Sequence, residues 1–326
     1  MWTLKLLRFD QVPSDFREPF IISGYRSCQS SASSCLASAL QRTNETINFW
    51  THFIPAIIFL RLTWMVAVND HGVAHDPLMW PVIVFLFGTF CYTMASSVAH
   101  MFNSMSQCAR YTFFFIDYFG ISMYSFGTCL ACYTYSFPPE LIDTPLYHVY
   151  IPVAMVTAFG STYLACCSRF STWAPLRDGG RLPAFAIPYI WCKIPLVYRL
   201  IYCESTGCDS DALYFQMWQF YFIFGISLLY STRFPEVIAP GKFDFIGHSH
   251  QFFHIGSSLA SYCHYLAFLA ELEERPDFIE QHGMPTFMST FGVFLAVLVG
   301  NVAIVWVLSL WVVRIKSRSK ATEYSD

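Results

Sequence analysis

Charged residues are scarce in this sequence. Only 13% of its 326 residues are charged, about half the share of a soluble globular protein, whereas 55% are apolar and 19% aromatic. This composition excludes a soluble globular domain and is typical of a protein embedded in a bilayer. A basic stripe is also missing, since the formal net charge is -3 and the pI is near 6.3. Without such a stripe to neutralise phosphates, nucleic acid is excluded as a partner.

Several other signals are absent. The opening stretch MWTLKLLRFD has no apolar core of signal-peptide length, so we expect the first membrane helix to direct insertion itself. The sequence shows no internal repeat, and no cysteine pair lies in the context of a zinc knuckle. Most of the twelve cysteines lie in apolar runs, where they behave as small hydrophobic residues. Only Cys203 and Cys208, near an outer loop, are placed to form a disulfide.

Long apolar segments are abundant instead. Crossing the hydrocarbon core takes roughly 20 mostly apolar residues, and eight segments qualify: 47–68, 78–100, 111–135, 146–168, 183–203, 211–231, 249–270 and 286–313. The fifth is the least regular, because three prolines interrupt it and Lys193 lies within it, although neighbouring helices can satisfy the carbonyls that prolines free. The sequence therefore predicts an all-α integral membrane protein with a seven-helix core and one additional C-terminal transmembrane helix.

The positive charges set the orientation. If the N-terminus is cytoplasmic, fifteen lysines and arginines fall in inner segments, against Arg275 alone in the outer loops. We therefore predict a cytoplasmic segment over residues 1–45, a membrane domain over 46–313 and a cytoplasmic tail over 314–326. The glycosylation sequon at Asn44 lies on the cytoplasmic side in this topology, so we expect Asn44 to be unmodified.

Three histidines occur in the stretch GHSHQFFH, at the start of the seventh segment. His250 and His254 are four residues apart, so on a helix their Cβ atoms lie roughly 5 to 6 Å from each other. Such a pair is half of a metal site or, as an equal alternative, a pair of interfacial histidines that bond to backbone and water. His248 faces away from His250 and is interpreted as interfacial.

Two other histidine positions are weaker candidates. His264 lies farther along the seventh segment, and we expect an interior histidine with satisfied hydrogen bonds. His71 and His75 share the four-residue spacing, but they lie in a glycine-containing loop that need not be helical, so no metal site is predicted there.

The topology brings further groups to the depth of the histidine pair. His100 ends the second segment near the cytoplasmic edge, and Asp117 lies six residues into the third, about 9 Å at 1.5 Å per residue. Three imidazoles and a carboxylate from three helices thus reach nearly the same depth as one another. Because a carboxyl group inside a membrane segment is costly, it marks a functional site by default.

Three histidine ligands leave one tetrahedral position open, which is the arrangement of catalytic zinc. We therefore predict His100, His250 and His254 as zinc ligands. Asp117, one shell farther out, would orient a water or accept its proton. Ser96 lies four residues before His100 and either lines the same cavity or donates to its own helix backbone.

Four motifs carry a resemblance to a known family. They are TNETINFWTHFIP (residues 43–55), SSVAH at the end of the second segment, DYFGIS from Asp117, and RFPEVIAPGKFDFIGHSHQFFH (residues 233–254). They resemble the progestin and adipoQ receptor (PAQR) family, and the stretch APGKFDFIGHSHQ resembles its membrane progestin receptor branch. The resemblance implies a heptahelical core with a cytoplasmic N-terminus and a zinc near the inner face, held by His100, His250 and His254 beside Asp117 and Ser96.

Two functions remain open at this stage. The resemblance implies a plasma-membrane receptor for progesterone-like steroids that signals rapidly, with a steroid or lipid as ligand and a G protein as a candidate partner. The three-histidine site more directly supports a zinc-dependent hydrolase that cleaves an amide in a lipid such as ceramide, with Asp117 as base and then acid. No inverted repeat or chain of intramembrane charges supports a transporter, and a zinc that only ties helices together is a further alternative.

Overall fold

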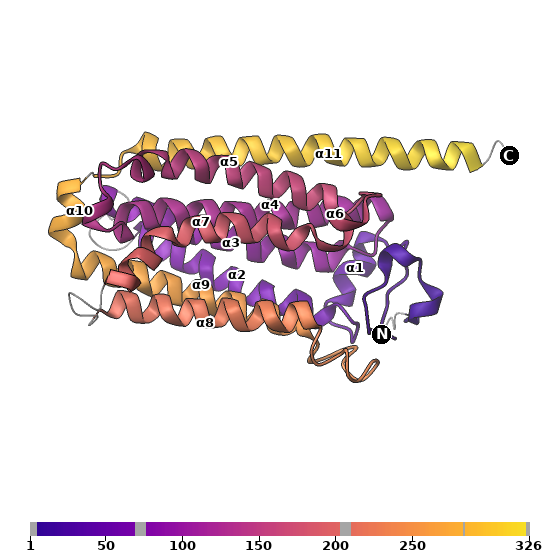
Figure 1. Cartoon of the computed structure of the whole chain (residues 1–326). Coiled ribbons are helices and arrows are strands. Elements are labelled where there is room, and N and C mark those ends of the chain that lie inside the picture. Colours follow the sequence, from indigo (N-terminus) through magenta and orange to yellow (C-terminus); the bar gives the residue numbers. More distant parts are fainter. Residues whose placement is uncertain (1–4, 69–75, 203–209, 283, 324–326) are drawn as a thin grey trace.

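The chain folds into a bundle of long helices that lie roughly side by side (Figure 1). The computed structural model describes residues 5–68, 76–202, 210–282 and 284–323. The long helices are α2 (Thr46–Val68), α3 (Trp80–Phe102), α4 (Gln107–Ala131), α5 (Pro145–Ser168), α7 (Arg181–Tyr202), α8 (Asp211–Thr232), α9 (Ser249–Glu274) and α11 (Val293–Glu323). They match the eight predicted segments one for one. Since the described residues form no strand, the predicted all-α fold is confirmed.

Short elements fill the connections. They are α1 (Ala32–Ser38), α6 (Ala174–Gly179), α10 (Pro276–His282), π-helical turns at Cys132–Ser136 and Met288–Gly292, and 3-10 turns at Phe9–Gln11, Ser14–Phe16, Pro77–Met79 and Pro139–Leu141. The irregular fifth segment is one helix, α7, with Pro188 and Pro195 inside it. The Tyr150 hydroxyl donates to the Cys192 carbonyl (2.8 Å), close to the position where Pro195 removes a helical hydrogen bond.

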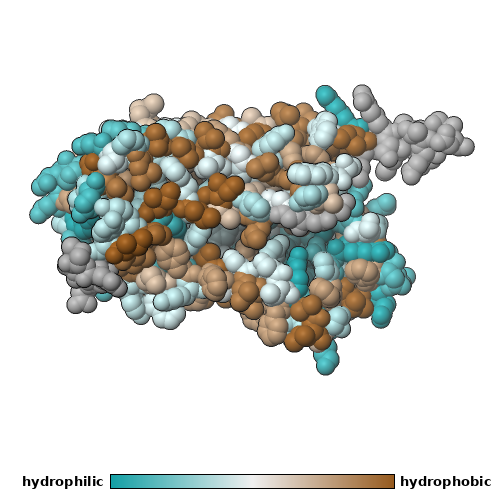
Figure 2. Space-filling model, in the orientation of Figure 1, coloured by the Kyte–Doolittle hydropathy of each residue, from teal (hydrophilic) through white to brown (hydrophobic). Residues whose placement is uncertain are grey.

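Seven of the long helices, including α11, are long and apolar enough to cross a membrane, and α9 is not among them. The 26 residues of α9 suffice in length, but many of its side chains are polar and face the bundle interior. The buried ones are Ser249, Gln251, His254, Ser258, Ser261, His264 and Glu271. Because these groups point away from lipid, average composition understates how well α9 fits a membrane. Figure 2 shows hydrophobic residues along the middle of the bundle and hydrophilic residues at its ends.

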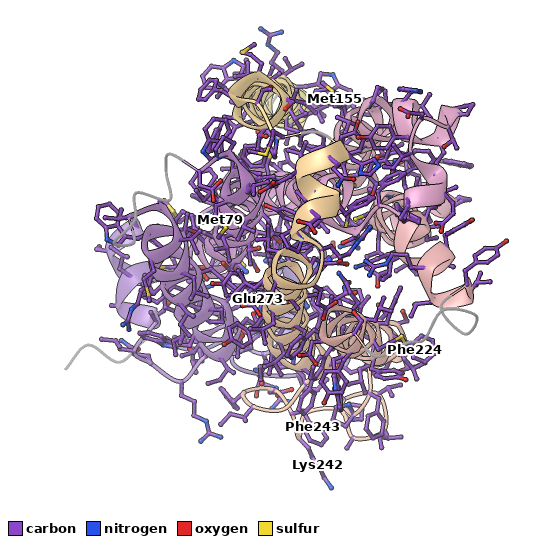
Figure 3. The ribbon with its side chains drawn as sticks, turned by 90° about the vertical axis from the view of Figure 1, so that its left-hand side faces the viewer. Met79, Met155, Phe224, Lys242, Phe243 and Glu273 are labelled. Carbon is purple, nitrogen blue, oxygen red and sulfur yellow. The ribbon has the colours of Figure 1, made fainter. Side chains whose placement is uncertain are left out.

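The helices α3 and α4 form the centre of the bundle. They pack on each other, α2 and α9 pack against α3, α5 packs against α4, α7 against α5 and α8 against α9. The helix α11 packs on α4 and α5 at the edge of the bundle (Figures 1 and 3). This arrangement is the predicted seven-helix core with one additional C-terminal helix.

Glycines allow α3 and α4 to approach each other closely. A Cβ atom at Gly120 would lie 2.7 Å from the Cα of Tyr92, and one at Gly127 would lie 3.0 Å from the carbonyl oxygen of Val84. Small residues at such spacing let membrane helices pack backbone to backbone. Asp117 is three residues before Gly120 on α4, so this close packing brings its carboxylate toward α3.

The N-terminal segment lies at the end of the bundle where the C-terminus also lies (Figure 1). It has a small apolar core of Val12, Phe16, Ile21 and Tyr25. Buried Asp244, between α8 and α9, accepts hydrogen bonds from the backbone N–H groups of Ile22 (2.9 Å) and Ser23 (2.7 Å). The N-terminal segment is therefore fastened to the connection that precedes α9.

Some predictions concern residues outside the described ranges. The pairing of Cys203 with Cys208 and the assignment of His71 and His75 belong to this group. Asn44, by contrast, is described, and its buried position (5% exposed) leaves no room for a glycan on its side chain.

Candidate metal centre

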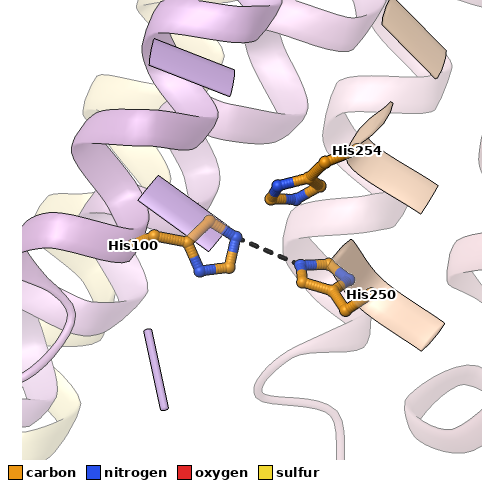
Figure 4. A group of neighbouring side chains, drawn as sticks. All are labelled: His100, His250 and His254. Carbon is orange, nitrogen blue, oxygen red and sulfur yellow. Dashed lines mark hydrogen bonds between the residues drawn. The ribbon is translucent and has the colours of Figure 1, made fainter. Parts of the chain in front are cut away.

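Three histidine side chains meet at one end of the bundle. His100 comes from the last turn of α3, and His250 and His254 come from the first turns of α9 (Figure 4). Each offers a ring nitrogen, and these three atoms lie within 4.8 Å of one another. The Nε2 atoms of His100 and His250 are 3.1 Å apart. The structure thus brings together the three histidines that depth and spacing select.

The start of α9 is fixed by local backbone chemistry. Gly247 has φ +89, a left-handed conformation that glycine adopts without strain. Buried Glu236 accepts hydrogen bonds from the Ser249 backbone N–H (2.7 Å) and from the Ser249 hydroxyl. A carboxylate on the first N–H groups of a helix satisfies donors that lack an intrahelical partner and complements the helix dipole. These contacts fix the register of α9 and therefore the directions of His250 and His254.

Hydrogen bonds on the far side of two rings determine which nitrogen is free. The Nδ1 atom of His100 lies 2.8 Å from a carboxylate oxygen of Glu45, and the Nδ1 atom of His254 lies 3.0 Å from the carbonyl oxygen of Asn48. A carbonyl and an ionised carboxylate only accept hydrogen bonds, so each Nδ1 carries the proton and donates. The Nε2 atoms of His100 and His254 are consequently unprotonated, which is the state a metal ligand requires.

Glu45 is the centre of a buried polar network. Its two carboxylate oxygens accept from the side-chain amides of Asn48 (2.8 Å) and Asn103 (2.7 Å). Arg26 donates to the Oδ1 atom of Asn103 (2.7 Å) and to the carbonyl oxygen of His100 (2.7 Å). Burial alone would raise the pKa of the Glu45 carboxyl, but the hydrogen bonds from His100 and Asn48 and the positive charge of Arg26 hold that pKa well below its ordinary value. The carboxylate is therefore ionised and holds His100 in place.

The donor set fits a divalent transition metal. Three imidazoles converge, two of them with their protons held on the opposite nitrogen, and His254 is almost completely buried. Imidazole nitrogen is a preferred ligand of zinc, and three protein ligands leave one position of a tetrahedron open. His100, His250 and His254 are the residues that would hold such an ion, and zinc binding itself stays a prediction.

The other two predicted site residues lie on α3 and α4, which pack on each other. Asp117 is half-buried on α4. It is not part of the group of three histidines, and its role beside a metal stays a prediction. Ser96 is buried on α3 and makes none of the hydrogen bonds found among the described residues, whereas Ser97 donates to the carbonyl of Thr93 (2.8 Å). The interpretation that Ser96 bonds to its own backbone is thus not what the structure has.

Two histidines outside the group differ from expectation. His248 precedes α9 and is buried, and its Nε2 has no partner among the described residues. It is therefore covered by protein rather than lying open at the interface. For His264, the prediction of a fully satisfied interior histidine is wrong: its Nε2 contacts the Nζ of Lys193 (3.1 Å), but its buried Nδ1 has no partner among the described residues.

Sequence reasoning missed the residues that orient the histidines. The sequence predicts no role at the site for Glu45, Asn48 or Asn103, although the first two belong to the quoted stretch TNETINFW. The available signal was a carboxylate directly before the first apolar segment, on the same side of the membrane as the histidines. Its partner could not be identified, because His100 is 55 residues away in the chain.

Comparison with known proteins identifies the family to which this chain belongs. The haemolysin-III related family model matches residues 40–265, which is more than half of the chain and includes all three histidines, Glu45 and Asp117. The chain belongs to this family. The resemblance to progestin and adipoQ receptors that the four motifs indicate is thereby confirmed.

Within the family, the similar proteins are named membrane progestin receptors. Membrane progestin receptor gamma-A of Danio rerio is 37% identical over 329 residues, covering 94% of each chain. Membrane progestin receptor delta of Mus musculus is 40% identical over 277 residues, covering 83% of this chain and 80% of its own. Membrane progestin receptor gamma of Homo sapiens is 37% identical, covering 86% of each chain.

Proposed function

We propose that this protein is a membrane receptor for progesterone-like steroids. The observation that carries the proposal is the match to proteins named membrane progestin receptors along 94% of the chain. A helical bundle with an apolar interior is a suitable host for a steroid, which buries most of its surface on binding. Signalling through a G protein belongs to the proposal, and steroid-dependent nucleotide exchange in reconstituted membranes tests it.

The proposal includes an orientation in the plasma membrane. We assign residues 1–45 to a cytoplasmic segment, 46–313 to the membrane domain and 314–326 to a cytoplasmic tail, on the basis of the bias in positive charge. The histidine group, the N-terminal segment and the end of α11 lie at the same end of the bundle (Figure 1). In this orientation the metal centre faces the cytoplasm.

A zinc ion held by His100, His250 and His254 is part of the same proposal. In the receptor, the ion would tie α3 to α9 and so stabilise the bundle, since metal binding contributes directly to folding free energy. When bound, zinc would also supply Lewis acidity toward a carbonyl group and make a nearby water more acidic.

The geometry favours a second candidate, hydrolysis of a lipid amide such as ceramide. The observation behind it is Asp117, a half-buried carboxyl group on α4 that makes no hydrogen bond among the described residues. Asp117 would accept a proton from water and return it to the leaving amine. Release of fatty acid and sphingoid base by the wild type and by Asp117→Ala tests this candidate, and equal rates would eliminate it.

Saturable binding of labelled progesterone tests the receptor proposal directly. The purified full chain in lipid nanodiscs should bind progesterone in a way that unlabelled progesterone displaces and cholesterol does not. Thermal unfolding and zinc content of the same sample show that the protein is folded. A folded, zinc-loaded sample without saturable binding would refute the receptor function.

A further inference from the structure

A second buried polar cluster lies deeper in the bundle than the metal centre. The Nζ of Lys193 on α7 lies 3.1 Å from the Oε1 of Gln216 on α8 and 3.1 Å from the Nε2 of His264 on α9. All three side chains are at least 97% buried. His264 is ten residues beyond His254 on the same helix, which corresponds to about 15 Å along the axis. The cluster is therefore separate from the three-histidine group.

This cluster contains donors without acceptors. The ammonium of Lys193 and the Nε2 of His264 are in contact, so His264 accepts there and its Nδ1 must carry a proton. That Nδ1–H has no partner among the described residues, and neither does the side-chain amide nitrogen of Gln216. The amide nitrogen of buried Gln219, next to Gln216 on α8, is unpaired as well, while its Oε1 accepts from the Tyr189 hydroxyl (3.4 Å).

The positive charge of Lys193 is also unbalanced. None of the ion pairs among the described residues includes Lys193. A buried N–H group without an acceptor costs about 1 to 3 kcal/mol, and a charged side chain inside a membrane helix marks a functional site by default. An acceptor oxygen from outside the chain would recover this free energy if it entered the cluster.

The helices around this cluster are not all closely packed on one another. The backbone of α7 packs against α5 and α4, whereas the backbones of α8 and α9 lie farther from it. Long side chains such as Lys193 and Gln216 bridge this distance. On its outer side the cluster is bounded by an apolar contact between Leu196 of α7 and Leu213 of α8. If an elongated apolar molecule entered between these helices, one end of it would reach the unpaired donors of His264 and Gln216.

We propose that Lys193, Gln216 and His264 form a binding subsite for a carbonyl oxygen at one end of an elongated apolar ligand. This inference rests on the proposed function for the identity of the ligand, a progestin whose ketone accepts hydrogen bonds from the Lys193 ammonium and the Gln216 amide. The same chemistry would receive the carboxyl or amide oxygen of a long acyl chain. The subsite is distinct from the metal centre and involves no metal ligand.

Binding of paired ligands to the full chain tests the subsite. Lys193→Met should weaken progesterone binding about 10- to 100-fold, because a hydrogen bond from a charged donor is lost. Two progesterone analogues, each lacking one of the two ketones, separate recognition from general damage. The analogue without the recognised ketone should bind wild type and Lys193→Met equally. Equal weakening of progesterone and both analogues would overturn the proposal.

Controls and a second ligand keep the outcomes distinguishable. Lys242→Met removes an exposed lysine of the connection between α8 and α9 (Figure 3) and should leave binding unchanged. If Lys193→Met unfolds, Gln216→Met replaces it. Labelled palmitate is the second probe: palmitate binding that needs Lys193, without progesterone binding, would uphold the subsite and refute the receptor function. Progesterone binding that does not depend on Lys193 or Gln216 would uphold the receptor function and refute the subsite. A folded wild type that binds neither probe would refute both the subsite and the receptor function.

Discussion

The unprotonated Nε2 atoms of two histidines result from contacts on the opposite side of each ring. Glu45 and the Asn48 carbonyl accept hydrogen bonds from the Nδ1–H groups of His100 and His254, and this leaves both Nε2 atoms available to a metal. The energetic cost of burying Glu45 is offset by hydrogen bonds to both of its carboxylate oxygens. The protonation of the three-histidine group is therefore set by residues outside it.

At this scale we predict that His250→Ala removes the metal. With two imidazoles left, affinity should fall enough for zinc to be lost during purification, because each ligand contributes directly to metal binding. Zinc content per protein, measured by plasma mass spectrometry, should fall from near one to near zero. His148→Ala, an exposed histidine of α5, is the control and should retain zinc. Full zinc occupancy in a folded His250→Ala protein would exclude the site.

Glu45→Gln tests the role of the outer contact. A neutral amide oxygen accepts the Nδ1–H of His100 more weakly than a carboxylate does, and substitutions of this type typically cost 10- to 100-fold in metal affinity. Competition with a zinc chelator should show this decrease. Glu18→Gln is the matched control, since Glu18 pairs with Arg110 (2.9 Å), away from the histidines. If both variants keep wild-type affinity, Glu45 does not orient His100.

At the scale of helices, the close approach of α3 and α4 depends on glycine. A Cβ atom at Gly120 would meet the backbone of Tyr92, which cannot move aside without separating the helices. Such overpacking typically costs about 1 to 3 kcal/mol. The same displacement would shift Asp117 on α4 relative to His100 on α3, so this contact links bundle packing to the site.

We therefore predict that Gly120→Ala lowers the thermal unfolding temperature in detergent and weakens zinc binding. Gly160→Ala is the matched control, because a Cβ atom there has no neighbour within 4 Å. Alanine favours a helix over glycine by about 1 kcal/mol, so Gly160→Ala should be neutral or stabilising. Equal unfolding temperatures for the two variants would contradict this account of the interface.

At the scale of the whole molecule, orientation follows from charge. The positive residues predict that α10 lies outside the cell and Asn44 inside. A new sequon made by Glu280→Asn with His282→Thr in exposed α10 should therefore be glycosylated in mammalian cells. An endoglycosidase-sensitive shift on a gel measures it. Asn44→Gln should leave the gel mobility unchanged. Glycosylation at Asn44 would contradict the proposed topology.

The sequence alone determined the eight helices, because each needs only a sufficient run of apolar residues, and it determined the three converging histidines through their common depth. The depth of a residue in the membrane does not show in which direction its side chain points around the helix axis. It also does not identify partners that are distant in the chain. Only the tertiary structure brought Glu45 to His100, and only the packing of α7, α8 and α9 joined Lys193, Gln216 and His264. Hydrogen bonds act over about 3 Å, so these pairings are decided by side-chain packing rather than by hydrophobic pattern.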